Sequence, residues 1–273
     1  MRRLFMLALV LVPLGLAAKT GEANDEAKNR DDGVVHLFNG KDLTNFYTWL
    51  AAPRGEKQPL GKNNDPLKVF TVVDGAIRIS GEVFGGFITE REYGDYRLNV
   101  EYKWGEKTYP PREKAARDSG ILLHCQGEDG SASAWMPSIE CQMIEGGTGD
   151  LIIIGNKQHP FRITAEVENR GGQTYYKPGA TAREFTGGRV NWYARDPQWK
   201  DVKGFRGKDD IEKPVGEWNT YEIIADGDTI TAILNGKTTA MGTKCNHTRG
   251  KILFQSEAAE VFFRRIDLKP LRK

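Results

Sequence analysis

Apolar and polar residues alternate with a period of two along much of the chain, which predicts β-strands rather than helices. Residues 95–104 (DYRLNVEYKW) show the pattern most clearly, with an apolar residue at every second position. The runs are separated by residue pairs that tolerate positive φ at both turn positions, namely Asp74-Gly75, Asp226-Gly227 and Asn235-Gly236. Many short strands together with 31 glycines predict an all-β sandwich.

Two of the predicted strands carry polar residues where a sandwich core would need apolar ones. They lie in residues 117–126 (RDSGILLHCQ) and 138–150 (SIECQMIEGGTGD). Strict alternation gives each strand one apolar face and places His124, Glu140 and Gln142 on the other. If the strands are neighbours, these three side chains gather on one face and form the candidate functional site.

The three cysteines leave two alternatives open. Alternation places Cys125 and Cys141 on the apolar faces of the two neighbouring strands, where they form either a disulfide or two buried thiols. Cys245 would then be unpaired. The spacing of histidine and cysteine does not fit a structural zinc site.

The ends of the chain predict an exported protein. Residues 1–18 have the positive start, short apolar run and small residues of a signal peptide. Residues 19–33 are polar and without periodicity, which indicates a disordered lead-in. Residues 34–272 form a single predicted domain, in which residues 168–214 are a long, weakly periodic excursion near the rim of the site. We expect a periplasmic or secreted bacterial protein without a membrane anchor.

The charge of the chain excludes one class of partner. Lysine and arginine number 39 against 37 acidic residues, which gives a net charge of +2, and the basic residues are scattered. A nearly neutral chain with scattered basic residues has no positive surface field that would attract nucleic acid. The oligomeric state is left open.

Seven sequence blocks, in this order, identify a family. They are LFNGKDLTNF, VVDGAIRISGE, GGFITEREYGDYRLNVEYKW, DSGILLHCQG, SIECQMIEGGTGD, WNTYEIIADGDTITAILNGK and ILFQSEAAEVFFRRIDLKPL. Over about residues 34–271 the chain resembles the 3-keto-disaccharide hydrolase domain family. The resemblance implies a concanavalin A-like jelly roll, a sandwich of two curved antiparallel sheets whose concave face binds a small carbohydrate. It also implies cleavage of glycosides whose C3 hydroxyl has been oxidised to a ketone.

The same resemblance assigns residues to the site. Where the family commonly has a histidine after the last glutamine, this chain has Glu257. Either Glu257 takes over the role of that histidine, or the activity has been lost. The positions assigned in this way are Glu101 and Lys103 in VEYKW, His124 after SGI, Glu140 and Gln142 in IECQ, and Gln255 and Glu257 in FQSEA.

A 3-keto sugar allows cleavage by elimination. The ketone acidifies the C2 proton, a base removes it, the enolate expels the C1 substituent, and water adds to the product. We expect His124 to be the base, with Glu140 orienting it or serving as the base itself. Lys103 would stabilise the enolate, while Gln142 and Gln255 hold sugar hydroxyls. A divalent metal ion on His124 and Glu140 would do the same electrostatic work.

Other interpretations of these residues are open. Glu101 and Lys103 alternate on a polar strand face, where an exposed cross-strand salt bridge explains them equally well. Trp135 is either a platform on which a sugar stacks or a lid over the edge of the sandwich. A conventional glycosidase would use Glu101 and Glu140 as its carboxyl pair. A non-catalytic, lectin-like sugar-binding module is the alternative function, because one fold hosts many activities.

Overall fold

The computed structural model describes residues 33–271 of the chain. These residues form strands, turns and loops, and no helix occurs among them. Accordingly, the described part of the chain offers no helix that could span a membrane. The signal peptide predicted for residues 1–18 and, apart from Gly33, the lead-in predicted for residues 19–33 lie outside the described residues, so export stays a prediction.

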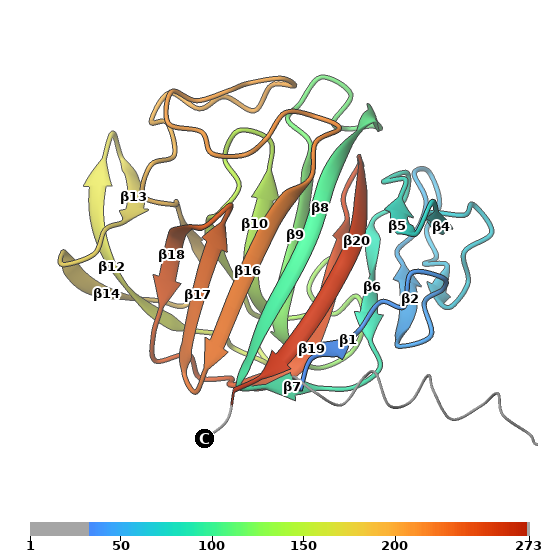
Figure 1. Ribbon diagram of the computed structural model, residues 1–273, viewed down its shortest axis with the longest axis horizontal. Coiled ribbons are helices and arrows are strands. Elements are labelled where there is room, and N and C mark those ends of the chain that lie inside the picture. Colours follow the sequence, from blue (N-terminus) through green and yellow to red (C-terminus); the bar gives the residue numbers. More distant parts are fainter. Residues whose placement is uncertain (1–32, 272–273) are drawn as a thin grey trace, which may run out of the picture. The chain divides into compact units, whose positions relative to one another are not determined.

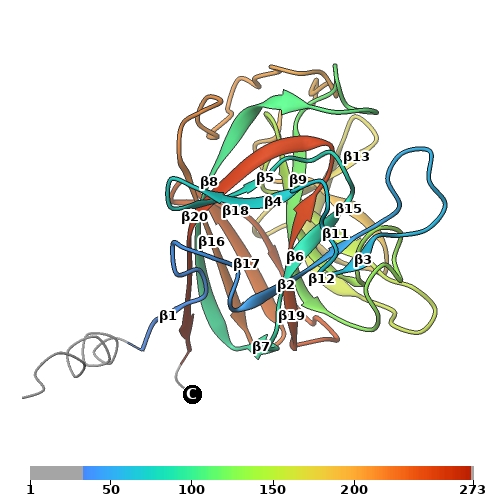
Figure 2. The ribbon, with the colours of Figure 1, turned by 90° about the vertical axis from the view of Figure 1, so that its right-hand side faces the viewer.

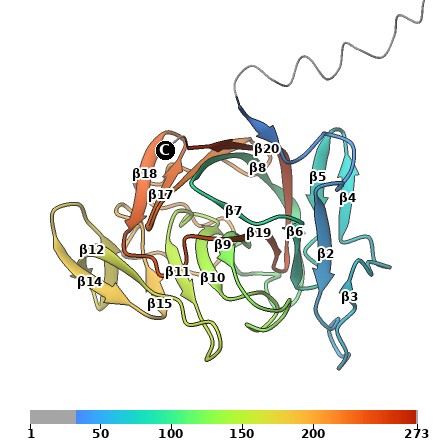
Figure 3. The same ribbon diagram turned by 90° about the horizontal axis from the view of Figure 1, so that it is seen from below.

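Two large antiparallel sheets face each other, with sheet A in front of sheet B in Figure 1 and the two layers visible from below in Figure 3. Sheet A has the spatial order β18 (Lys237–Gly242), β17 (Thr229–Leu234), β16 (Asn219–Asp226), β8 (Tyr96–Thr108), β20 (Ala259–Pro270), β5 (Ala76–Ile79) and β4 (Phe70–Val73), with β1 (Val35–His36) paired to β20. Sheet B has the order β15 (Gly188–Val190), β11 (Leu151–Ile154), β10 (Ser138–Ile144), β9 (Asp118–Cys125), β19 (Arg249–Ser256), β6 (Gly85–Thr89), β2 (Phe46–Leu50) and β3 (Gly61–Lys62), with β7 (Tyr93–Gly94) paired to β19.

The core lies between the two sheets, and it follows from the alternation of the strands. From Tyr96 to Trp104, every second residue of β8 is buried, while the residues between them are partly exposed. The predicted all-β jelly-roll sandwich is therefore confirmed. The inward-facing residues of the central strands are Leu98, Val100, Tyr102 and Trp104 in β8, Ile121 and Leu123 in β9, and Ile139, Cys141 and Met143 in β10.

The predicted hairpins form at all three turn signals. Asp74-Gly75 joins β4 to β5 with φ of 50° and 73°, and Asn235-Gly236 joins β17 to β18 with φ of 47° and 81°. Between β16 and β17 the loop is one residue later than predicted, because Asp226 still pairs with Thr229. These two-residue turns require a positive φ, which glycine adopts at little cost in free energy.

The cysteines are all free thiols. Cys141 belongs to the core between the sheets. Cys125 belongs to a separate apolar cluster with Leu122 and Met136 on the opposite face of sheet B. The expectation that Cys125 and Cys141 share a face is wrong, and of the two alternatives the structure has buried thiols rather than a disulfide.

Residues 168–214 are more regular than the weak periodicity suggests. A three-stranded sheet of β12 (Ile163–Arg170), β13 (Gln173–Tyr176) and β14 (Thr181–Phe185) occupies the first half. The following strand, β15, pairs with β11 at the edge of sheet B. This pairing adds residues of the excursion to the sheet that contains the polar strands β9 and β10, with β15 next to β11 (Figure 2).

A buried carboxylate anchors the end of this excursion. Glu212 Oε1 accepts hydrogen bonds from Tyr102 Oη (2.6 Å), Trp104 Nε1 (2.8 Å) and Thr148 Oγ1 (2.9 Å), and Oε2 accepts one from the Gly146 amide (3.1 Å). Burial raises the pKa of Glu212 to about 7, and the donors oppose that shift. The side chain thus joins the excursion to sheet A and to the turn between β10 and β11.

Replacing Glu212 with glutamine is expected to destabilise the fold. The amide nitrogen would be a donor facing donors, which leaves at least one buried group unsatisfied and costs about 1–3 kcal/mol. Chemical denaturation of the variant measures this, with the exposed Glu217→Gln as the matched control. Equal midpoints for the two variants would contradict the anchoring role.

Candidate active site

The face of sheet B that points away from the core carries a pocket of about 440 Å³. A volume of this size fits a small ligand. Trp135 and aliphatic residues of β11 form the apolar part of the lining. The polar part of the lining consists of Asp118, Ser133, Glu140, Gln142, Arg189, Gln255 and Glu257.

Strand register explains why two of these side chains converge. Glu140 lies on β10 and Gln255 on β19, on either side of β9. Between them Gly120 has no side chain, and a Cβ there would lie 2.2 Å from Glu140 Oε1 and 2.8 Å from Gln255 Oε1. Glycine at position 120 therefore lets both side chains close over the strand, and any larger residue would displace them.

Glu140 is one of two glutamic acids in the cluster whose pKa is strongly raised. The residue is 3% exposed, and its Oε1 is buried without a hydrogen-bond partner. Burial raises its pKa to about 8, the negative charge of Asp118 adds to the shift, and Arg189 opposes it. Glu140 can therefore exchange a proton near neutral pH.

Asp118, in contrast, is held on both oxygens. Gln142 Nε2 donates to Oδ1 at 2.7 Å, and Arg112 Nη1 lies 3.3 Å from Oδ2. Burial raises the pKa of Asp118 to about 6, against the pull of Arg112. Because both oxygens are engaged, Asp118 acts as a positioning carboxylate, and its charge raises the pKa of its neighbours.

Glu257 is the third carboxyl of the cluster. Its backbone pairs with Asp118, and its side chain lines the same pocket. Burial raises its pKa well above the usual range, and the charges of Asp118 and Glu140 add to the effect. Glu257 is consequently protonated when Asp118 is ionised, which makes it a proton donor.

Arg189 brings a positive charge to the pocket. It lies on β15, and its Nη1 is 3.4 Å from Oδ2 of Asp150, a carboxylate with no exposed surface. Asp150 also accepts from the Trp192 amide at 2.8 Å and pairs with Arg195. The Arg189 side chain remains 34% exposed and can meet a ligand.

Stability should fall as pH rises because of Glu140. Its pKa is about 8 in the folded chain against 4.5 for the free group, so between these values the folded state holds a proton that the unfolded state has lost. Glu140→Gln removes this penalty. Relative to the parent, we expect the variant to gain about 1–3 kcal/mol between pH 5 and 8.5. Denaturation at both pH values measures the gain, and the exposed Glu113→Gln should show none.

Trp135 has a fixed orientation beside the carboxyl cluster. Its Nε1 donates to the Gly85 carbonyl at 2.9 Å, and its ring stacks on Phe84 with centroids 5.8 Å apart and planes at 21°. The indole is partly exposed and lines the pocket. A sugar platform and a wall of the sandwich edge are both compatible with this position, so the stacking role stays a prediction.

The expectation that His124 shares a face with Glu140 and Gln142 is wrong. His124, the second-last residue of β9, has a φ of 54°, and this positive φ breaks the alternation of side chains at the end of the strand. The ring is fully buried, packs edge-to-face on Tyr96 of sheet A at 6.0 Å, and Nδ1 is 2.8 Å from the His247 carbonyl. Burial lowers its pKa to about 4. His124 is a neutral interior residue and does not line the pocket.

Glu101 and Lys103 also lie away from the pocket. Both point outward from β8 in sheet A, whereas the pocket lies on sheet B. Glu101 pairs with Arg264 at 2.5 Å, and the Lys103 ammonium lies 5.0 Å from the Trp218 ring centre. Glu101 therefore fits the alternative interpretation given above, in which it forms a cross-strand salt bridge on the outer face of the sheet. The structure supports neither the enolate role of Lys103 nor a carboxyl pair of Glu101 with Glu140.

The predicted metal pair does not fit the structure. His124 Nε2 lies buried between the sheets without a partner, while Glu140 faces the pocket on the other side of sheet B. The two side chains cannot share one ion. Among residues 33–271, no group of three histidine, cysteine or carboxylate side chains is arranged around a common metal position.

The structure brings together Glu140, Gln142, Gln255, Glu257 and Trp135 from the predicted set, and their chemical roles stay predictions. Sequence reasoning missed Arg189, which joins them through the β15–β11 pairing. The aromatic-rich excursion that contains Arg189 was expected near the rim of the site. The alternation of a three-residue strand is too short to single out that arginine.

The described part of the chain thus combines a jelly-roll sandwich with a polar pocket on one sheet face. The chain belongs to the family of 3-keto-alpha-glucoside-1,2-lyase-like domains, whose model matches residues 33–269. The family consists of domains similar to glycoside-acting enzymes.

The chain is similar to two solved structures, and only the first supports the fold. A protein of Parabacteroides distasonis, provisionally described as a glycosyl hydrolase, is 20% identical, with 93% of this chain and 99% of that chain covered and a TM-score of 0.51. The β-glucanase of Bacillus licheniformis is 10% identical, with 88% and 99% covered and a TM-score of 0.44. At these identities the likeness concerns the fold alone. No protein with a curated description matches the sequence.

Proposed function

We propose that the protein cleaves glycosides whose C3 carries a ketone, by elimination across C1 and C2 followed by hydration. The observation that carries the proposal is Glu140, a buried carboxyl with an unpartnered oxygen and a pKa of about 8, in the pocket on sheet B. Membership of the 3-keto-alpha-glucoside-1,2-lyase-like family supports the choice of substrate.

Glu140 is the base in this proposal. As a carboxylate it removes the C2 proton, whose acidity comes from the adjacent ketone. A base with a pKa near the working pH combines a useful ionised fraction with a strong affinity for the proton it takes. Glu140 replaces His124 in this role.

Arg189 stabilises the enolate. Removal of the C2 proton moves negative charge onto the C3 oxygen, and a fixed cation in a partly desolvated pocket lowers the energy of that state. The hold of Asp150 on Nη1 keeps the guanidinium in place before substrate arrives. Arg189 replaces Lys103 in this role.

Glu257 protonates the leaving group. As the C1–O bond breaks, the enolate electrons form the C1=C2 bond, and the departing oxygen takes the Glu257 proton. In the hydration step, water enters the pocket and exchanges with the proton on Glu140. Glu257 then removes a proton from water, the hydroxide adds to C1, and Glu140 transfers its exchanged proton to C2. Both carboxyls end in their starting states, and the net reaction is hydrolysis.

The remaining polar residues position the sugar. Gln255 Oε1 is buried without a hydrogen-bond partner and is free to accept from a sugar hydroxyl. Gln142 is fixed by its bond to Asp118, which keeps that carboxylate ionised beside the two glutamic acids. Trp135 offers an aromatic surface for the apolar face of the ring.

Substrate choice tests the proposal. The protein is incubated with a 3-keto-glucoside and with its unoxidised parent, and release of the aglycone is followed by NMR. We expect release from the keto sugar only. Cleavage of the parent would indicate a conventional glycosidase, and saturable line broadening without any product would indicate a lectin-like module; either result overturns the proposal.

A further inference from the structure

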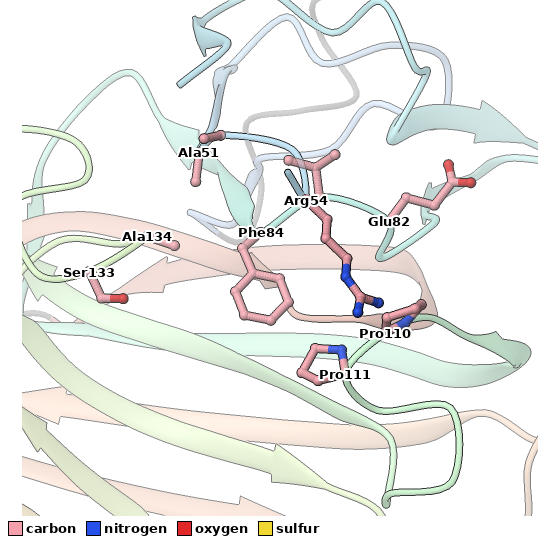
Figure 4. Close-up of a pocket in the computed structure, with 10 residues that line it drawn as sticks. Ala51, Arg54, Glu82, Phe84, Pro110, Pro111, Ser133 and Ala134 are labelled. Atoms are coloured by element: carbon pink, nitrogen blue, oxygen red, sulfur yellow. The ribbon is translucent and has the colours of Figure 1, made fainter. Parts of the chain in front are cut away.

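A second pocket adjoins the one on sheet B. It has a volume of about 590 Å³ and is lined by Ala51, Ala52, Arg54, Glu82, Val83, Phe84, Pro110, Pro111, Ser133 and Ala134 (Figure 4). Nothing in the proposed chemistry of the carboxyl cluster uses these residues. This second pocket, which is larger than the first, has room for another part of the substrate beside the sugar ring.

Two connections join the pockets. Ser133 lines both, and Phe84 of the second pocket stacks on Trp135 of the first. On the other side, the Tyr109 amide donates to the Ala258 carbonyl at 2.8 Å, which places the Pro110 segment beside Glu257. A group leaving C1 of a sugar that Glu257 protonates therefore departs toward the second pocket.

The lining of the second pocket is unlike that of a sugar site. Seven of its ten residues are apolar, including Phe84, Pro110 and Pro111. Of the polar residues, Glu82 is already engaged by Ser80 Oγ at 3.3 Å. Sugars need several converging hydrogen-bond partners, whereas rigid rings and proline surfaces favour a flat apolar ligand.

Arg54 covers this apolar surface. Figure 4 shows its side chain extending toward Pro110 and Pro111, beside the Phe84 ring. The Arg54 residue is exposed. A planar guanidinium stacks well on aromatic faces. From this position, the Arg54 guanidinium could stack on an aromatic ligand bound against Phe84 and the two prolines.

We propose that the second pocket is the leaving-group subsite and takes a planar aromatic aglycone between Phe84, the two prolines and Arg54. This assignment rests on the proposed function, since it places the aglycone of the same substrate. It adds a preference: aryl 3-keto glycosides should be better substrates than alkyl ones.

Two variants test the subsite on an aryl and a methyl 3-keto-glucoside of the same anomer. Ala52→Phe fills the pocket and should lower kcat/KM on the aryl substrate about tenfold. Arg54→Ala should lower it about fivefold. Neither should change kcat/KM on the methyl substrate, and the exposed Arg91→Ala should leave both unchanged. Equal losses on both substrates, or no loss on the aryl one, would overturn the assignment.

A binding measurement separates this inference from the chemistry. Phenol is titrated into the parent and into Ala52→Phe, and NMR shifts are followed. Saturable binding to the parent that the variant weakens supports the aromatic subsite, even if the 3-keto glucoside is not turned over. Turnover without such binding would leave the proposed function intact and overturn the subsite.

Discussion

Glu140→Gln should lower kcat on a 3-keto glycoside by about 1,000-fold, the scale of a lost general base. The amide has nearly the same shape as the carboxyl, so it keeps the packing over Gly120. It cannot take the C2 proton. Steady-state kinetics at pH 8 measures the effect, because the parent is substantially ionised there.

The pH profile distinguishes this loss from a structural one. In the parent, kcat/KM should rise with pH toward a plateau above about 8, since the base must be ionised. The exposed Glu113→Gln serves as the control, because it removes a carboxyl outside the pocket and should leave the profile unchanged. Activity of Glu140→Gln within tenfold of the parent would contradict the assignment of the base.

Arg189→Met should lower kcat by about 100-fold, as expected when one donor to a developing oxyanion is removed. Methionine retains the length and apolar stem of arginine but carries no charge. In the parent, the charge of Arg189 opposes the rise in the pKa of Glu140, so its loss should raise that pKa further. The ascending limb of the pH profile should then move to higher pH.

The control for Arg189 is an arginine in the same excursion. Arg183 is exposed on β14 and stacks over Phe185. Arg183→Met should leave kcat unchanged, and Arg189→Lys should recover part of the lost activity. If Arg189→Met reduced activity only through KM, the side chain would bind substrate without stabilising the enolate.

The sequence was informative where local patterns decide the structure. The alternation of β8 and the three turn signals follow from steric rules that act over a few residues. The strands and hairpins form as these rules predict, except that the loop between β16 and β17 is one residue later. The resemblance carried by the family blocks implied the jelly-roll sandwich of two antiparallel sheets. Glu140, Gln142 and Gln255 could be predicted because they interrupt otherwise apolar strands.

The placement of His124 could not be read from alternation. The register of β19 against β9 shifts between Lys251 and Leu253, and His124 adopts a positive φ opposite that shift. Gly250 permits the close approach, since a Cβ there would lie 2.4 Å from the His124 carbonyl carbon. One irregular residue reverses the faces of both His124 and Cys125.

The outer faces of the two sheets were also indistinguishable in the sequence. Glu101 and Glu140 each stand among apolar residues of a strand, but they point away from opposite sides of the sandwich. Arg189 became a candidate only once β15 was seen to pair with β11. Which polar face carries a pocket depends on contacts between distant segments.

The fate of the C2 hydrogen tests the central claim most directly. A 3-keto glucoside deuterated at C2 is incubated with the protein in ordinary water, and the product is analysed by NMR against a control without protein. Elimination predicts that deuterium is lost from C2 as the aglycone is released, and that Glu140→Gln prevents both. Release of the aglycone with the deuterium fully retained would contradict the account.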